Sequence, residues 1–416
     1  MALAADATPG GAVAEGRPVD GAVPRSGAVL GRVRRTNGRQ AEWRLSWAER
    51  RHHTFVAGAS GCGKSTLLLR AVQDDLSAGR TVVVIDPHGD LADKVFTLAG
   101  TERLTRIDPR NPASTAIDLL DPDPARSVSN LMSAVNEVWP ADFAGPVWHR
   151  AMSLTLRVLA AATGGEPVTL AAVERYLVDA TWRAEILQRL PEGRLRAEAL
   201  HEAAAWASRP SSDSSVVSWL AGKLTPLTQG PAAMLFDRVP EVPMEQLLRA
   251  RRAIVVSLPI GELGTDTVKV TVRMLLTRLT TALAAQGAWP EADRVPISIV
   301  IDEAHLFAGR AMSALFAQAR KFHGAVTVAT QSPGQLGAEL AGVLTNAQTL
   351  LLGRLSGAEA AVLRDRVGAD TVAALPVLPR HHLIVVTEDT APTRPPLVLT
   401  PAPLPIWSRS PAPEAA

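Results

Sequence analysis

The clearest chemical pattern in the sequence is the octapeptide G-A-S-G-C-G-K-S at residues 58–65. It matches the phosphate loop G-x-x-x-x-G-K-[ST], whose glycines let backbone N–H groups turn inward around a β-phosphate. An apolar run at 54–57 precedes it and a helical stretch at 66–76 follows, as this loop requires. The pattern predicts nucleotide binding by Gly58, Ala59, Ser60, Gly61, Cys62, Gly63, Lys64, Ser65 and Thr66.

Within this loop each residue type has its own chemistry. Lys64 is expected to neutralise the β- and γ-phosphate oxygens, Ser65 to bind Mg²⁺, and Thr66 to lie near the α-phosphate. Cys62 fits better as a small residue that fills space than as a catalytic thiol.

An acidic pair, Asp302 and Glu303, follows the apolar run at 297–301. If that run is a parallel strand, the pair emerges at the carboxyl edge of a sheet, where nucleotide chemistry takes place. Asp302 would then bind Mg²⁺, and Glu303 would polarise the water that attacks the γ-phosphate. The pair favours ATP hydrolysis, and the alternative is an acidic cap that begins a helix.

Three further residues are candidates for the same chemistry. Gln331 follows the apolar run at 325–330 and is either a γ-phosphate sensor or a turn residue. Arg320 lies eleven residues before it and is either an arginine finger for a neighbouring subunit or a solvated arginine at a helix end. His305, two residues after the acidic pair, has a packing or hydrogen-bonding role at least as readily as a catalytic one.

The composition limits the class of protein. Of 416 residues 47% are hydrophobic, which is typical of globular domains, and the one cysteine excludes a disulfide framework or a cysteine-based zinc site. No uninterrupted apolar run of about 18 residues and no signal peptide are visible, so we expect a cytoplasmic protein. The net charge of +2 indicates no strong field for a polyanion, although only five of the 43 basic residues are lysine.

The elements that must position these residues follow from the apolar pattern. Short runs rich in Val and Ile alternate with helical stretches, and their continuous apolarity predicts an α/β fold with a mostly parallel sheet. Residues 126–249 contain few such runs and much Ala, Leu, Glu and Arg, and we expect an all-helical insertion there. The predicted organisation is a disordered arm at 1–30, a discontinuous core at 31–125 and 250–390, that insertion, and a proline-rich tail at 391–416.

Together these residues resemble the HerA/FtsK branch of P-loop motor ATPases, and within it the TraG/TraD-like coupling ATPases of conjugation and type IV secretion. The resemblance covers residues 28–390 and rests on four segments, which are the loop at 58–66, V-V-V-I-D-P-H-G-D-L at 82–91, I-V-I-D-E-A-H at 299–305 and A-R-K-F-H-G-A-V-T-V-A-T-Q-S-P at 319–333. It implies a RecA-like core, an all-helical insertion, a hexameric ring and ATP-driven movement of DNA.

The resemblance also implies roles for individual residues. Lys64, Ser65, Asp302, Glu303 and Gln331 match the phosphate, metal, water-activating and sensor positions. Arg320 falls where coupling proteins place an arginine that enters the next subunit's site, and Arg354 is a second candidate for that finger.

Two features depart from the family pattern. Membrane coupling proteins usually begin with transmembrane helices and HerA proteins with a small β-barrel, and neither pattern is visible here. The chain then resembles a soluble member that another protein anchors at the inner face of the membrane, or a stand-alone DNA motor. The D-E-A-H string invites comparison with DEAH helicases, but their tandem RecA-like domains and Ser-Ala-Thr motif are absent from the sequence.

Three hypotheses of function remain open at this stage. The first is an ATP-driven DNA translocase or coupling motor, the second a secretion or assembly ATPase that acts on protein, and the third a nucleotide switch, which the acidic pair disfavours. Candidate DNA contacts, none separable from solvated charges, are Lys223, Arg249, Arg251, Arg252 and Lys269. The tryptophans of the helical stretch suit core packing better than base stacking and are Trp139, Trp148, Trp182, Trp206 and Trp219.

Overall fold

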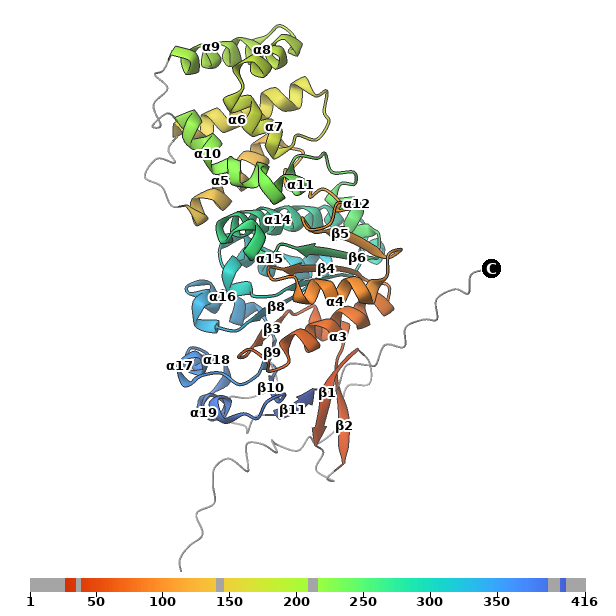
Figure 1. Cartoon of the computed structure of the whole chain (residues 1–416). Helices are drawn as coiled ribbons and strands as arrows, with labels where there is room; N and C mark the ends of the chain where they lie inside the picture. The colour runs from red at the N-terminus through yellow and green to blue at the C-terminus, as the bar shows by residue number, and fades with distance from the viewer. Residues whose placement is uncertain (1–26, 35–38, 140–145, 209–215, 388–396, 402–416) are drawn as a thin grey trace, which may run out of the picture.

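A long twisted sheet runs through the centre of the molecule, and helices cover both of its faces (Figure 1). The computed structural model describes residues 27–34, 39–139, 146–208, 216–387 and 397–401. Within these residues eleven strands form one sheet in the order β2-β1-β11-β10-β9-β3-β8-β7-β4-β6-β5. Their bounds are β1 Ala28–Arg34, β2 Gln40–Leu45, β3 Thr54–Ala57, β4 Thr81–Asp86, β5 Leu104–Ile107, β6 Ala253–Ser257, β7 Ile297–Ile301, β8 Gly324–Thr330, β9 Thr349–Leu352, β10 Leu383–Val386 and β11 Leu397–Pro401.

The middle of the sheet is parallel, as the continuous apolar runs predicted. Strands β3, β4, β6, β7 and β8 pair in parallel on both sides, and β9 pairs in parallel with β3 and antiparallel with β10. Every residue in these six strands is buried. Both faces of these strands are covered, so no polar alternation is needed, and the α/β prediction is confirmed. Strand β5 was not expected, because L-T-R-I is short, alternates buried and half-buried residues, and lies at the sheet edge.

The two ends of the described chain differ from the expectation. Strands β1 and β11 pair antiparallel with each other, and β11 pairs with β10, so residues 28–30 and 397–401 extend the sheet. The assignment of these residues to a disordered arm and a proline-rich tail was therefore wrong. The side chains of Ala28, Leu30 and Leu399 become buried only when these two distant segments pair in the sheet. Local composition does not reveal that pairing. The rest of the expected arm and tail, 1–26 and 402–416, lies outside the described residues.

Two helical layers sandwich the parallel strands. Helices α3 (Lys64–Ser77) and α4 (Asp90–Ala99) pack on one face, where their leucines and valines join Val56, Val82 and Val84 in one apolar cluster. Helices α14 (Thr265–Ala285) and α15 (Arg310–Ala319) pack on the other face, against Phe55, Val83 and Ile85. Shorter helices cover the loops and are α2 Trp47–Arg50, α13 Ile260–Leu263, α16 Glu339–Asn346, α17 Gly357–Ala361, α18 Arg364–Val367 and α19 Ala369–Ala374.

Between β5 and β6 the described chain contains helices and no strand. Helices α6 to α10 lie at the top of Figure 1, away from the sheet, and α5 packs on α14. The bounds are α5 Pro124–Val138, α6 Pro146–Ala162, α7 Leu170–Val178, α8 Ala180–Arg189, α9 Arg194–Ser208, α10 Val216–Thr228, α11 Ala233–Phe236 and α12 Met244–Arg249. Trp148 is buried and meets Trp219 edge to face at 4.9 Å, so these two tryptophans pack in the helical core.

A buried histidine joins the loop before β3 to two other elements. His53 Nε2 donates to the carbonyl of Phe316 at 2.8 Å, and His53 Nδ1 accepts from the N–H of Val326 at 3.1 Å. Both contacts require the neutral ring, because Nδ1 can accept only when it carries no proton. Burial lowers the pKa of His53 to about 4, and the charges of His52 and Arg320 act in the same direction.

This histidine predicts a loss of stability in mild acid. The unfolded chain binds a proton on His53 near pH 6.5 and the folded chain only near pH 4, so the free energy of unfolding falls as the pH is lowered through this window, by roughly 3 kcal/mol. His53→Asn, which tolerates the left-handed backbone at this position (φ 64°), is expected to flatten that dependence. Urea unfolding of both proteins between pH 7 and pH 4.5 measures it, and parallel profiles would contradict the assignment.

Candidate active site

The carboxyl ends of five neighbouring strands meet at one edge of the sheet. Strands β9, β3, β8, β7 and β4 are adjacent, and the loops after them carry nearly all the residues that the sequence singled out. The edge therefore brings together the phosphate loop, the acidic pair and Gln331, which are far apart in the sequence. This is the place where ligands bind in parallel α/β sheets.

The phosphate loop joins β3 to α3 and is tied to the two neighbouring strands. Its backbone N–H at Gly58 donates to Thr330 O at 3.2 Å, and that of Ala59 donates to Arg354 O at 2.8 Å. Gly61 and Gly63 have positive φ values of 74° and 107°, which turn the loop tightly into the first turn of α3. The loop geometry is thus that of a phosphate cradle at a helix N-terminus.

Two side chains within the loop have distinct surroundings. Lys64 is buried, and its Nζ donates to the carbonyl of Gly58 at 2.6 Å. Cys62 is buried between two glycines, since a Cβ added at Gly58 or Gly353 would lie 2.6 or 2.7 Å from its Sγ. The sulfur therefore packs the loop against the turn after β9, in keeping with a space-filling role.

The acidic pair follows β7 on a sharp turn. Glu303 has a left-handed backbone (φ 47°), and its own N–H donates to Asp302 Oδ1 at 2.9 Å. Glu303 is 4% exposed, and its Oε1 accepts a hydrogen bond from Gln331 Nε2. Its Oε2 has no hydrogen-bond partner among the described residues. The carboxylate is thus oriented by an amide on one oxygen and keeps the other for a reacting water.

Asp302 lies in an environment that suits a divalent cation. Burial, with the charges of Glu303 and Asp86, raises the pKa of Asp302 to about 6, and Lys64 acts in the opposite direction. Crowded carboxylates of this kind are stabilised by a hard cation with oxygen ligands. Mg²⁺ takes one or two protein carboxylates beside phosphates and water, and Asp302 and Ser65 are the residues here that would hold it.

Asp86 was missed as a site residue, although it lies in the D-P-H-G-D segment. It ends β4, next to β7, and is buried. Its Oδ2 accepts from the N–H groups of Leu91 and Ala92, at 2.8 and 2.9 Å, and so begins helix α4. A strand that ends in Asp-Pro is the signal that could have identified it. Its charge reaches Asp302 only because the two strands are neighbours.

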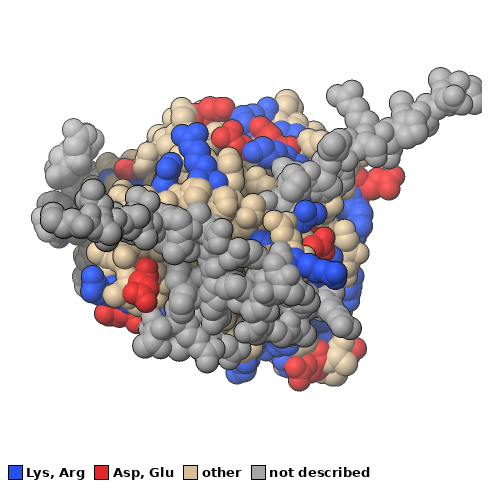
Figure 2. Space-filling model, turned by 90° about the horizontal axis from the view of Figure 1, so that it is seen from below, with Lys and Arg blue, Asp and Glu red and all other residues tan. Residues whose placement is uncertain are grey.

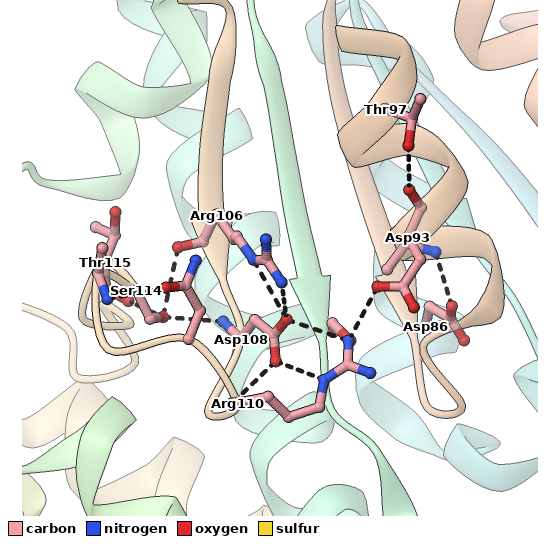
Figure 3. A network of polar contacts seen from close by, with 12 residues as sticks. Asp86, Asp93, Thr97, Arg106, Asp108, Arg110, Ser114 and Thr115 are labelled. Atoms are coloured by element: carbon pink, nitrogen blue, oxygen red, sulfur yellow. Dashed lines mark hydrogen bonds and ion pairs between the residues drawn. The ribbon is translucent and has the colours of Figure 1, made fainter. Parts of the chain in front are cut away.

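A polar network braces the loop after Asp86 (Figure 3). Arg110 pairs with Asp108, the residue after β5, and its Nη2 also lies 3.2 Å from Asp93 Oδ1 on α4. Burial alone would raise the pKa of Asp108, but hydrogen bonds from Arg110 and Arg106 outweigh it and hold the pKa below its usual range. The network ties the loop after β5 to helix α4, which follows the loop after β4.

The two candidate finger arginines lie at opposite ends of the parallel strands. Arg320 precedes β8 at its amino end, whereas Gln331 follows the carboxyl end of the same strand. Seven residues of strand separate them, which is roughly 20 Å. Arg354 is exposed beside the phosphate loop of its own chain, through the contact between its carbonyl and Ala59. Arg320 therefore lies far from its own site, and Arg354 lies close to it.

His305 contacts the acidic pair more closely than its sequence position indicated. It lies in a 3₁₀ turn (Ala304–Phe307), with Nδ1 3.4 Å from Glu303 Oε2 and 3.1 Å from Thr330 Oγ1. Burial lowers the pKa of His305, while the Glu303 carboxylate opposes that shift. The ring is thus a neutral hydrogen-bonding group at the site.

The candidate DNA contacts are mostly engaged with other groups. Lys223 lies over the rings of Trp139 and Trp219, and Arg249 lies over Trp289, with the guanidinium carbon 3.9 Å from the ring centroid. Arg251 donates to Gly79 O at 3.0 Å. The described atoms in Figure 2 carry both signs of charge side by side. Lys269 differs, because it lines an open cleft next to His305.

Solved structures share this fold. The bacterial conjugative coupling protein TrwB, in an unbound form lacking its N-terminal segment, has a TM-score of 0.59 at 14% identity and covers 91% of this chain and 89% of its own. TrwB with an ATP analogue has a TM-score of 0.60 at 18% identity, with 85% and 86% covered. VirB4 of Thermoanaerobacter pseudethanolicus has a TM-score of 0.61 at 16% identity, with 93% and 99% covered. No protein-family model and no curated sequence matches the chain.

These comparisons confirm the expected architecture and the resemblance to coupling ATPases at the level of the fold. The similarity extends over most of each chain, and therefore includes the helices between β5 and β6 as well as the sheet. Among the described residues, no helix combines the length and the apolarity needed to cross a bilayer.

Proposed function

We propose that this chain hydrolyses ATP to drive DNA through a ring of its own copies, as the coupling motor of conjugative or type IV secretion-like transfer. The observation that carries the proposal is the Glu303 carboxylate, held by Gln331 beside the phosphate loop. Its fold is similar to that of TrwB, which has been solved with ADP and Mg²⁺ and with an ATP analogue. DNA as the substrate and the hexameric ring are proposed from the four sequence segments that resemble coupling ATPases.

In this proposal the loop at 58–66 binds the triphosphate and Lys64 neutralises its β- and γ-oxygens. Ser65 and Asp302 hold Mg²⁺, which would offset negative charge as it develops on the phosphates. Glu303 accepts the proton of the attacking water, and Gln331 keeps the carboxylate in position. Arg320 reaches the site of the next subunit, where it stabilises charge in the transition state.

The proposed organisation places the motor core at residues 31–125 and 250–390 and an inserted helical domain at 126–249. Strands β1 and β11 extend the core's sheet beyond both outer boundaries. A membrane channel or anchor protein is the proposed partner that would recruit the cytoplasmic ring to the inner face of the membrane.

The test combines assembly with activity. With ATP and Mg²⁺ the protein is expected to form a ring, seen by analytical ultracentrifugation, and its ATPase rate is expected to rise several-fold with single- or double-stranded DNA. If the motor acts on a protein and not on DNA, the chain is expected to bind neither single- nor double-stranded DNA at low salt and to capture a protein partner instead. An intact ATPase indifferent to every DNA tested would overturn the DNA motor.

A further inference from the structure

A charged cleft opens directly beside the active site. It lies between α14, the 3₁₀ turn at 304–307, the start of α15 and α16, and it has a volume of about 570 Å³. His305 lines this cleft and also contacts Glu303, so one side chain belongs to both places. A single side chain, that of His305, therefore lies between the cleft and the Glu303 carboxylate, the proposed base.

The cleft carries uncompensated positive charge. Arg273 pairs with Glu137 at 3.1 Å, whereas Glu339 accepts a hydrogen bond from the neutral Ser313 hydroxyl and keeps its charge, so the three cations of the lining exceed its two carboxylates by one. Lys269 and Arg310 line the same cleft, and the structure gives neither side chain a hydrogen bond or an ion pair within the described residues. Two unpaired cations in an open cleft suit the phosphodiester backbone of a nucleic acid, which binds through such contacts without regard to sequence.

His305 lies against the free oxygen of the Glu303 carboxylate. Its Nδ1 is hydrogen-bonded to Thr330 Oγ1 at 3.1 Å and lies 3.4 Å from Glu303 Oε2, a contact without a hydrogen bond. Gln331 holds the other carboxylate oxygen, so the amide and the imidazole approach it from two different elements. A shift of His305 therefore changes what packs beside Glu303 Oε2, while Gln331 still holds Oε1.

We propose that His305 is a positioning residue that couples a nucleic-acid phosphate bound at Lys269 and Arg310 to the orientation of Glu303. This inference rests on the proposed DNA motor and adds where the DNA is sensed and through which side chain. Phosphate binding in the cleft shifts the turn at 304–307, and the Nδ1 contact transmits this shift to the carboxylate. In this proposal His305 acts through Glu303 and is not itself the base.

Four proteins test the coupling, with a single-stranded oligonucleotide and a duplex as probes. His305→Ala is expected to lower the DNA-stimulated kcat about tenfold, with the KM for ATP and the DNA affinity unchanged. His305→Asn, whose side-chain amide replaces Nδ1, is expected to restore most of that loss. Lys269→Ala with Arg310→Ala is expected to weaken DNA binding and to reduce the salt slope of the affinity by about 2. Lys94→Ala with Arg364→Ala, which removes two exposed charges elsewhere, is the matched control and leaves stimulation unchanged.

The outcomes separate the two proposals. A wild-type ATPase that ignores both DNAs refutes the proposed motor and, with it, the sensing role. A wild type that is stimulated, alongside a cleft double variant and His305→Ala that are stimulated equally, refutes the inference alone. If His305→Ala fails to fold, the cleft double variant still decides whether DNA is sensed there, because within the described residues the side chains of Lys269 and Arg310 make no hydrogen bond or ion pair that the substitution would remove.

Discussion

Glu303→Gln is expected to bind ATP normally and to lose hydrolysis by a factor of roughly 10²–10⁴. The amide keeps the shape of the side chain and can still meet Gln331, but it cannot accept a proton from water. Its neighbours Asp302 and Lys64 remain, so the triphosphate and Mg²⁺ still have their ligands. The variant should therefore accumulate ATP-bound protein, measured as retained nucleotide after rapid desalting and as residual phosphate release.

Two comparisons make this result specific. Lys64→Ala removes the buried ammonium of the phosphate loop and is expected to lose nucleotide binding as well as hydrolysis. Glu262→Gln neutralises an exposed carboxylate on α13 and is expected to behave like the wild type. Should Glu303→Gln hydrolyse ATP at more than about a tenth of the wild-type rate, Glu303 would not be the base.

Mixed rings are expected to recover activity that neither parent protein has. Arg320 lies at the amino edge of β8 and Gln331 at the carboxyl edge, so an arginine side chain cannot span the distance within one chain. An Arg320 that takes part in hydrolysis must therefore act on another copy. Arg320→Ala alone is expected to lose about 10³-fold in kcat, as removal of an arginine finger does.

The mixing experiment uses Arg320→Ala with Glu303→Gln. In a 1:1 mixture of head-to-tail rings, roughly a quarter of the sites combine an intact Glu303 with a neighbour's intact Arg320. These sites should hydrolyse ATP at rates far above either parent. Arg354→Ala mixed with Glu303→Gln is the contrasting case, because Arg354 lies beside its own phosphate loop and serves the same chain. Recovery with Arg354→Ala and none with Arg320→Ala would exchange the two assignments.

The sequence predicted the chemistry of the site better than its surroundings. The phosphate loop needs a fixed order of glycines, lysine and serine within eight residues, so it is visible locally. The acidic pair and Gln331 each follow a continuous apolar run, and parallel strands expose their carboxyl ends on one edge. These local rules were enough to predict that residues 58–66, 302–303 and 331 would meet. They also located the middle strands of the sheet, because strands covered on both faces are apolar throughout.

Other features depend on which segments become neighbours in space. Asp86 matters because β4 pairs with β7, and His305 because the turn after Glu303 folds back toward Thr330. Strands β1 and β11 pair across more than 360 residues, and their stability comes from burial that exists only in the finished sheet. No local pattern carries this information.

The two candidate arginines show most clearly what the sequence determines and what the tertiary structure decides. By itself the sequence determined that Arg320 and Arg354 each flank a strand near the proposed nucleotide chemistry. Only the tertiary structure decided which end of the sheet each one occupies, since Arg320 precedes its strand and Arg354 follows one. Strand direction turns this difference of order into a position at opposite ends of the parallel strands. The same geometry leaves Lys269 and Arg310, distant in sequence, together in a cleft beside His305.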